Sequence, residues 1–212
     1  MIKKTVTMHM LGSCKTVKEL SYIKDNYFAF VNNESKEYSR IITIEACCDE
    51  AEMHIKKECE GVTINCCKGN TGIAGAILLT LKNVSTDYYV TIHNDALIKK
   101  AFIDEAIKKF GNNTVTVAGT NPHGEGVDSW CMVHDTEKLK QSIKNIPTEY
   151  VNRVCGENYT EEIPWFYSKF LTIQNAIIKT FGQDSIVADK NINEAVEHQW
   201  LKRYLRGSAV ND

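Results

Sequence analysis

Segments with the pattern of buried strands alternate with segments of helical periodicity along the first 120 residues of the chain. The expected strands are short apolar or alternating runs, at residues 4–10, 40–45, 62–66, 87–92 and 114–119. Helical spacing is found between them, at residues 14–25, 49–60, 73–81 and 98–110. This alternation is typical of an α/β fold, with a mostly parallel central sheet and helices on both of its faces.

The remaining segments are less regular. An aromatic run at residues 27–31 predicts a strand or an extended connection, and the polar residues 32–39 predict a loop. After residue 120 the expected order is a glycine-rich loop, a short strand, a helix, a second loop, a long helix, a strand and a tail, at residues 121–128, 129–134, 136–143, 156–164, 165–181, 186–188 and 189–212.

Length and charge narrow the class of protein. A chain of 212 residues is enough for one α/β domain, whereas two domains would each be small, so we expect one domain over residues 1–212. Because the formal net charge is −2 and the basic residues are scattered, the sequence argues against a surface built mainly to neutralise nucleic-acid phosphates, which leaves a local basic groove beside an active site open. No apolar run has the length of a bilayer span, and the alternating start predicts a strand rather than a signal peptide. We therefore expect a cytoplasmic protein.

The eight cysteines include two vicinal pairs, Cys47-Cys48 and Cys66-Cys67. Neighbouring residues of a strand point to opposite faces, so a vicinal pair there cannot direct both thiols at one metal ion. The chain also lacks the C-x-x-C spacing that is usual in zinc sites. We interpret the cysteines as reduced thiols that pack as small apolar side chains.

Polar residues follow several of the expected strands, at the edge of the sheet where ligands bind in such folds. They are His9, Glu45, Asn70 and the run His93-Asn94-Asp95. A carboxylate such as Asp95 at the mouth of a parallel sheet is suited to hold Mg²⁺ or Mn²⁺, which can bridge two phosphates. The alternative is that Asn-Asp after a strand is ordinary turn chemistry.

The segment Gly69-Asn70-Thr71-Gly72-Ile73-Ala74-Gly75-Ala76 begins an apolar helix, and the next strand ends in His93-Asn94-Asp95-Ala96. This order resembles the inverting family-2 glycosyltransferases with the Rossmann-like A-type fold. They have a helix start similar to N-x-G-x-A-x-A, followed by a strand ending in D-x-D or a motif similar to N-N-D-A. Here His93 stands at the first acidic position of D-x-D, while Asp95 keeps the last. The resemblance covers roughly residues 2–200.

The resemblance implies a nucleotide-diphosphate sugar as donor, Mn²⁺ or Mg²⁺ as cofactor, and direct displacement with inversion. It assigns the nucleotide base to Glu45, the metal or diphosphate to Asp95 and His198, and nucleotide contact to the end of the first strand, from His9 to Ser13. His93 and Asn94 then lie beside the donor. Residues 1–120 would form the donor half, and residues 121–212 the acceptor half.

Two glycine-containing turns allow more than one interpretation. Asn70 and Gly72 precede a helix and could cradle a donor phosphate on its N–H groups, although the Gly-Lys-Ser/Thr ending of a P-loop is missing. Gly72 equally suits a tight entry into the helix. The segment 11–15 is a poor match to the basic glycine-rich loop of a nucleotidyltransferase, which we rank as a less favoured alternative.

An inverting transfer needs a general base near the acceptor hydroxyl, normally a carboxylate. Glu161 and Glu162 precede the expected acceptor-side helix and are the nearest match to the family's acidic pair, with Asp128 as the second choice. The alternative for Glu161 and Glu162 is a solvated acidic helix start. Trp130 and Trp165 could stack on a sugar or simply cover the core.

The acceptor is left open: a saccharide, a protein side chain, a metabolite or a modified nucleobase all suit the chemistry. The oligomeric state is also open. The non-enzymatic alternative is a domain of the same fold that binds a nucleotide or a partner and has lost catalysis, and His93 in place of an acidic residue is what favours it.

Overall fold

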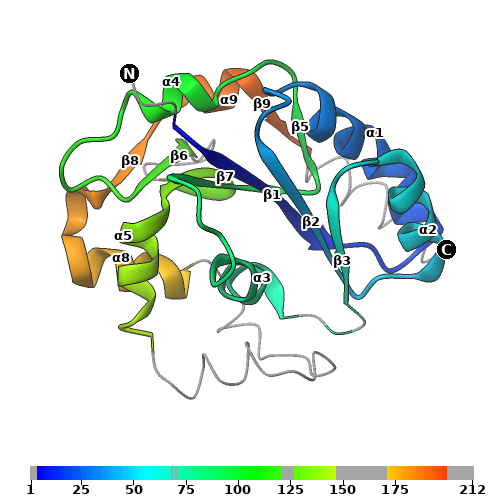
Figure 1. Ribbon diagram of the computed structural model, residues 1–212, viewed down its shortest axis with the longest axis horizontal. Helices are drawn as coiled ribbons and strands as arrows, with labels where there is room; N and C mark the ends of the chain where they lie inside the picture. The colour runs from blue at the N-terminus through cyan, green and yellow to red at the C-terminus, as the bar shows by residue number, and fades with distance from the viewer. Residues whose placement is uncertain (1–3, 68, 70, 121–126, 147–170, 200–212) are drawn as a thin grey trace, which may run out of the picture.

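The computed structural model describes residues 4–67, 69, 71–120, 127–146 and 171–199. In this part of the chain seven strands form one sheet in the order β3-β2-β1-β4-β7-β6-β8 (Figure 1). Their bounds are β1 Val6–Ser13, β2 Ser39–Glu45, β3 Thr63–Cys66, β4 Tyr88–His93, β6 Thr116–Thr120, β7 Val127–Asp135 and β8 Ile186–Ala188. Strands β3, β2, β1 and β4 are parallel, and β6 is parallel to β8, whereas β7 runs antiparallel to both of its neighbours. The predicted mostly parallel sheet is confirmed.

Helices cover both faces of this sheet, as predicted. One face packs against α1 (Val17–Asn32), α2 (Asp49–Glu58), α4 (Ile103–Ile107) and α9 (Lys190–Ala195). The other packs against α3 (Gly72–Leu81), α5 (Thr136–Ile143) and α8 (Leu171–Phe181), followed by the short 3₁₀ helix Gln183–Ser185. Because successive strand residues point to opposite faces, β4 gives Val90 to the first core and Tyr89 to the second.

Helix α1 corrects the prediction of a strand or extended connection at residues 27–31. Thr16 caps its N-terminus by accepting a hydrogen bond from the Glu19 backbone N–H at 3.1 Å, and the helix then continues to Asn32. The aromatic residues suggested a strand because they favour that conformation. They are instead buried with helical spacing, which decides the structure: the large apolar side chains on this face are Leu20, Ile23, Tyr27 and Phe30.

A second correction concerns residues 98–110 and the expected tail. Only Ile103–Ile107 form a helix there, whereas Ala96–Ile98 form β5, which pairs antiparallel with β9 (Val196–His198). Helix α9 and β9 both lie in the segment that we described only as a tail, without predicting a helix or strand there. Pairing between segments so far apart in the chain leaves no local periodicity, which explains why the sequence did not reveal it.

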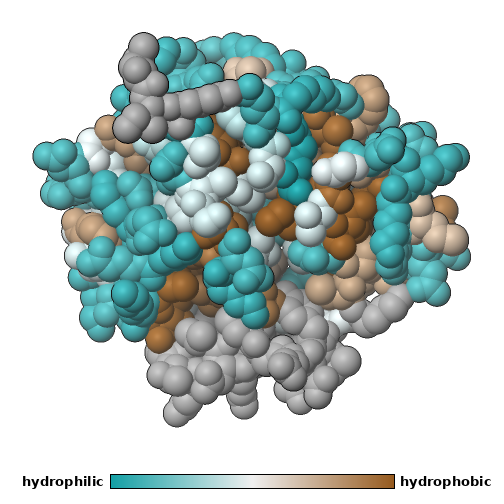
Figure 2. All heavy atoms as spheres, viewed as in Figure 1, coloured by the Kyte–Doolittle hydropathy of each residue, from teal (hydrophilic) through white to brown (hydrophobic). Residues whose placement is uncertain are grey.

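Few large apolar side chains of the described residues are exposed. Figure 2 shows hydrophilic side chains around much of the rim of the face in view and apolar side chains mostly toward its middle. The large apolar side chains that are well exposed are Val17, Phe28, Met53 and Leu171. Among the described residues, no helix has both the length and the apolar character needed to cross a membrane.

Two histidines are buried inside the sheet and held by neighbouring strands. His9 Nδ1 lies 2.5 Å from the Tyr89 hydroxyl and its Nε2 lies 2.8 Å from Thr43 Oγ1. His134 lies between Thr91 and Thr116 in the same way, at 3.2 and 2.9 Å. Burial lowers the pKa of each imidazole to about 3. This position corrects the expectation that His9 contacts a nucleotide, because both of its ring nitrogens are engaged within the protein interior.

These histidines predict a loss of stability in mild acid. Their folded pKa lies below the unfolded value, so the unfolded state binds more protons between pH 6.5 and about 3. Their contribution is complete above pH 6.5, and the free energy of unfolding should fall by about 1.4 kcal/mol per pH unit for each histidine as the pH is lowered from there. Urea unfolding of the wild type and of His134→Gln between pH 7.5 and 5 measures this slope.

His134→Gln should have a slope smaller by about one proton, whatever its stability at neutral pH. Leu139→Ala, which removes a fully buried side chain from α5, controls for general destabilisation and should keep the wild-type slope. Equal slopes in all three proteins would contradict the assignment of neutral buried histidines.

Candidate functional site

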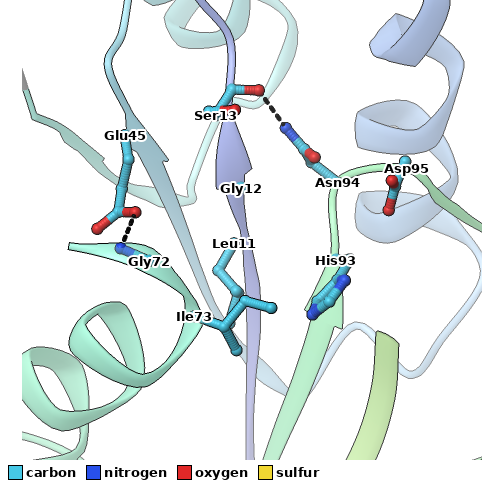
Figure 3. Close-up of a pocket in the computed structure, with 9 residues that line it drawn as sticks. All are labelled: Leu11, Gly12, Ser13, Glu45, Gly72, Ile73, His93, Asn94 and Asp95. Atoms are coloured by element: carbon cyan, nitrogen blue, oxygen red, sulfur yellow. Dashed lines mark hydrogen bonds between the residues drawn. The ribbon is translucent and has the colours of Figure 1, made fainter. Parts of the chain in front are cut away.

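A pocket of about 190 Å³ opens where β1, β2 and β4 end and α3 begins (Figure 3). Because β2 and β4 lie on opposite sides of β1, this is the switch point at which ligands bind in open α/β sheets. Nine residues line the pocket: Leu11, Gly12, Ser13, Glu45, Gly72, Ile73, His93, Asn94 and Asp95. The predicted residues Glu45, Gly72 and His93-Asn94-Asp95 are therefore together.

Asn94 holds the ends of β1 and β4 in contact. Its backbone N–H donates to the Leu11 carbonyl and its side-chain amide donates to the Ser13 carbonyl, each at 2.9 Å, while its own carbonyl accepts from Asn26 Nδ2 of α1. The amide lies so close to Gly12 that a Cβ there would be 2.2 Å from Asn94 Oδ1. Glycine is therefore required at position 12, and the wall of the pocket depends on it.

Glu45 lies at the N-terminus of α3. Its carboxylate accepts hydrogen bonds from the backbone N–H groups of Thr71 and Gly72, at 3.0 and 2.8 Å, and from the Thr71 hydroxyl. A carboxylate is favoured there because it satisfies free N–H groups and faces the positive end of the helix dipole. Gly72 has φ 68°, a conformation that favours glycine. Glu45 thus fixes the helix start while it borders the pocket.

Three side chains of types that can ligate a metal ion converge beside this pocket. One ligand atom each of His93, Asp95 and His198 lies within 4.8 Å of the other two, and His198 Nε2 is 3.6 Å from Asp95 Oδ1. His93 ends β4, Asp95 follows in the turn, and β9 brings His198 opposite Ala96. The structure therefore brings together Asp95 and His198, the pair that the family resemblance assigned to the metal.

Trp130 orients one of these ligands. Its indole stacks on the His198 imidazole, with ring centroids 5.5 Å apart and planes inclined by 16°. The indole lies close to Gly119, where a Cβ would be 2.7 Å from the ring. Trp130 is almost fully buried, so its role is packing behind His198. The other tryptophan considered for sugar stacking, Trp165, lies outside the described residues.

The three side chains fit a divalent metal ion. Two ligands about 2.1 Å from one ion at a tetrahedral angle are about 3.4 Å apart, close to the separation of His198 and Asp95. The side chains of His198 and Asp95 are 19% and 13% exposed, which leaves access from the solvent. A carboxylate and two imidazoles are a donor set that first-row transition metals accept.

The predicted acceptor side is less well placed. Glu161 and Glu162, and the predicted phosphate contact Asn70, lie outside the described residues. Asp128 lies near the start of β7 and is not among the residues that line the pocket. The sequence analysis did not identify Gly12 and Asn26 as supports of the site. A signal for Gly12 was present, because Leu11-Gly12-Ser13 comes directly after the apolar run at residues 4–10, as His93-Asn94-Asp95 comes after the run at residues 87–92.

No protein-family model and no curated protein matches the sequence, whereas many solved structures match its fold. The mannosyltransferase PcManGT from Pyrobaculum calidifontis, in complex with GDP-Man and Mn²⁺, is 14% identical with a TM-score of 0.54, over 76% of this chain and 55% of that one. Glucosyl-3-phosphoglycerate synthase from Mycobacterium tuberculosis, in complex with Mn²⁺, UDP-Glc and glycerol 3-phosphate, is 12% identical with a TM-score of 0.57, over 87% and 69%. The chain has the A-type glycosyltransferase fold.

A third structure of this A-type fold is the glycosyltransferase GlyE of Streptococcus pneumoniae TIGR4, 12% identical with a TM-score of 0.53, over 89% of this chain and 46% of that one. The chain thus spans only about half the length of GlyE and of PcManGT. The predicted A-type architecture is confirmed, and at these identities the likeness is one of fold.

The close contact between Gly12 and Asn94 predicts that a methyl group added at position 12 lowers the stability of the protein. Gly12→Ala should lower the free energy of unfolding by about 1–3 kcal/mol, because the new Cβ overlaps the Asn94 amide and forces the strand ends apart. In an Asn94→Ala background the same substitution should cost less than half as much, which a double-mutant cycle by urea unfolding measures. Gly111→Ala is the control, since its Cβ would meet only Thr114 Oγ1 at 3.7 Å. A cost for Gly12→Ala no larger than for Gly111→Ala would contradict the contact.

Proposed function

We propose that the protein transfers a sugar from a nucleotide-diphosphate donor to an acceptor hydroxyl, with a divalent metal ion at the diphosphate. The observation that carries this proposal is the cluster of His93, Asp95 and His198 at the edge of the pocket, in a chain with the A-type glycosyltransferase fold. Two solved structures of that fold contain Mn²⁺ together with a nucleotide sugar, which supports the same kind of cofactor and donor here.

The charges around the pocket support a metal-assisted mode of binding. The described residues that line it include the carboxylates of Glu45 and Asp95 and no lysine or arginine. A diphosphate brought next to these carboxylates needs a positive charge to offset the repulsion. A divalent ion held by Asp95 and His198 would supply that charge and stabilise the departing nucleoside diphosphate.

The chain's own residues position the donor in this proposal. The strand end Leu11–Ser13, fixed by Asn94, forms one wall for the nucleotide, and Glu45 and Gly72 at the start of α3 form the other. Residues 1–120 would supply most of the donor site and residues 121–212 the acceptor site together with His198. Holding donor and acceptor in line lowers the barrier because the encounter no longer costs translational and rotational entropy.

A carboxylate must take the proton of the acceptor hydroxyl as the acceptor oxygen attacks the sugar from the side opposite the diphosphate, which inverts the configuration. Glu161 and Glu162 are our proposed bases, with Asp128 of β7 as the second choice. The acceptor classes given above, a saccharide, a protein side chain, a metabolite or a modified nucleobase, all carry a suitable hydroxyl.

Thermal unfolding with a panel of nucleoside diphosphates and their sugars, with and without Mn²⁺, tests the donor site. At a ligand concentration of about 100 times Kd the stabilisation is about 2.7 kcal/mol, which raises the Tm by about 5–10 °C for a chain of this size. We expect this shift with one nucleotide in the presence of Mn²⁺, and its loss in Asp95→Ala. Asp25→Ala, which removes an exposed carboxylate from α1, should keep it.

Release of nucleoside diphosphate from the best-binding nucleotide sugar, followed in the presence of Mn²⁺, then distinguishes an enzyme from a binding domain. A rate above that of buffer, lowered at least tenfold by Asp95→Ala, would support the transferase. Tight binding without turnover would favour a nucleotide-binding domain of the same fold. The absence of any nucleotide-dependent shift would refute the donor site.

A further inference from the structure

His93 gives the candidate metal site an unusual donor set for this fold. It occupies the position at which the sequence resemblance leads us to expect an acidic residue, and one of its ring nitrogens lies within 4.8 Å of a ligand atom of Asp95 and of His198. Its ring centroid is 6.3 Å from that of His198, with the two planes inclined by 75°. The site therefore offers two imidazole nitrogens and one carboxylate.

This donor set discriminates between metal ions. Mg²⁺ is a hard ion that takes oxygen ligands in near-ideal octahedral geometry and seldom takes imidazole. Mn²⁺, Co²⁺ and Zn²⁺ accept imidazole nitrogen, and affinity for such sites rises from Mn²⁺ to Co²⁺ and remains high for Zn²⁺. A site that replaces one carboxylate by imidazole therefore loses affinity for Mg²⁺ and gains it for transition metals.

The backbones that carry both imidazoles belong to paired strands before any ion binds. His93 lies opposite Leu11 in the β1–β4 register, so its backbone is part of the central sheet. His198 lies opposite Ala96 in the β5–β9 pair, and its ring stacks on Trp130. Ligands on a fixed backbone lose less conformational entropy on binding than ligands on a mobile loop, which favours a site of fixed geometry.

The donor set also changes the charge of the occupied site. With one carboxylate and two neutral imidazoles, a divalent ion keeps a net charge of about +1, whereas two carboxylates would leave about zero. The described lining of the pocket contains no lysine or arginine, so this remaining charge is what would attract an anionic ligand.

We propose that His93 is a metal ligand and that His93, Asp95 and His198 form a two-histidine, one-carboxylate site that binds Mn²⁺, Co²⁺ and Zn²⁺ and rejects Mg²⁺. The metal-binding part of this proposal depends only on these three residues and not on the proposed function. The consequence that a nucleotide-diphosphate donor requires a transition metal rests on the proposed function.

Direct metal titration of the full chain, without nucleotide, tests the site. Calorimetry should give Co²⁺ and Zn²⁺ affinities at least about 100-fold above that of Mg²⁺. Bound Co²⁺ should show the visible absorption of nitrogen and oxygen ligation without a sulfur-to-metal charge-transfer band, which distinguishes this site from binding to cysteine thiols. His93→Ala should lower the Co²⁺ affinity at least about tenfold. His54→Ala, which removes a histidine from α2, is the matched control and should leave it unchanged.

The sharper test is His93→Asp, which restores an acidic residue at this position. We expect it to raise Mg²⁺ affinity and lower Zn²⁺ affinity, each about tenfold, so that the preference is reduced about 100-fold. Circular dichroism and thermal unfolding verify that the variant is folded, and His93→Asn, of similar size to Asp but uncharged, replaces it if it is not. With His93→Asn the Zn²⁺ affinity should fall while the Mg²⁺ affinity stays low.

Two results would overturn the inference: Mg²⁺ binding to the wild type as tightly as Mn²⁺, or Co²⁺ affinity and spectrum unchanged in His93→Ala. These outcomes differ from failure of the proposed function. Selective metal binding without any nucleotide binding would support the metal site and refute the proposed transferase function. Nucleotide binding supported equally by Mg²⁺ and Mn²⁺ would support the donor site and refute the proposed role of His93 in metal selection.

Discussion

The contact between Gly12 and the Asn94 side chain is the constraint on which the site depends. It allows the ends of two parallel strands to approach closely enough for Asn94 to reach the Ser13 carbonyl, and the same residue connects to α1 through Asn26. The turn that carries Asp95 therefore begins from a fixed point. A larger residue at position 12 would move the strand ends, the turn and the pocket wall together, because close-packed interiors transmit such displacements.

Most of the central sheet could be predicted from the sequence because its strands are locally recognisable. The run Tyr88–His93 is apolar enough to read as a strand buried on both faces, and Gly72 correctly marks the start of α3. The error at residues 27–31 arose because aromatic residues favour strands when they are considered alone, whereas burial along one side of α1 decided their conformation.

The candidate site was predictable only in part. The position of Asp95 follows from the rule that ligands bind at strand ends, but its proximity to His198 depends on the pairing of β5 with β9, two strands of three residues each. Such short pairings have no sequence signature, and only the resemblance to a family pointed to His198. For His9 the local rule failed, because the residue lies four positions before the end of β1 and is enclosed by the sheet.

The location of β9 has a further consequence. The strand is three residues long, and it carries His198 back to Asp95 across about 100 residues of intervening chain. In the proposed site, an ion shared by these two side chains would link the last described strand to the rest of the fold without a covalent bond. Short strands with a single pairing partner open more readily than the core of a sheet, and open segments are cut by proteases. The supply of metal would thereby govern how long the segment around β9 resists proteolysis, whether or not a sugar donor is present.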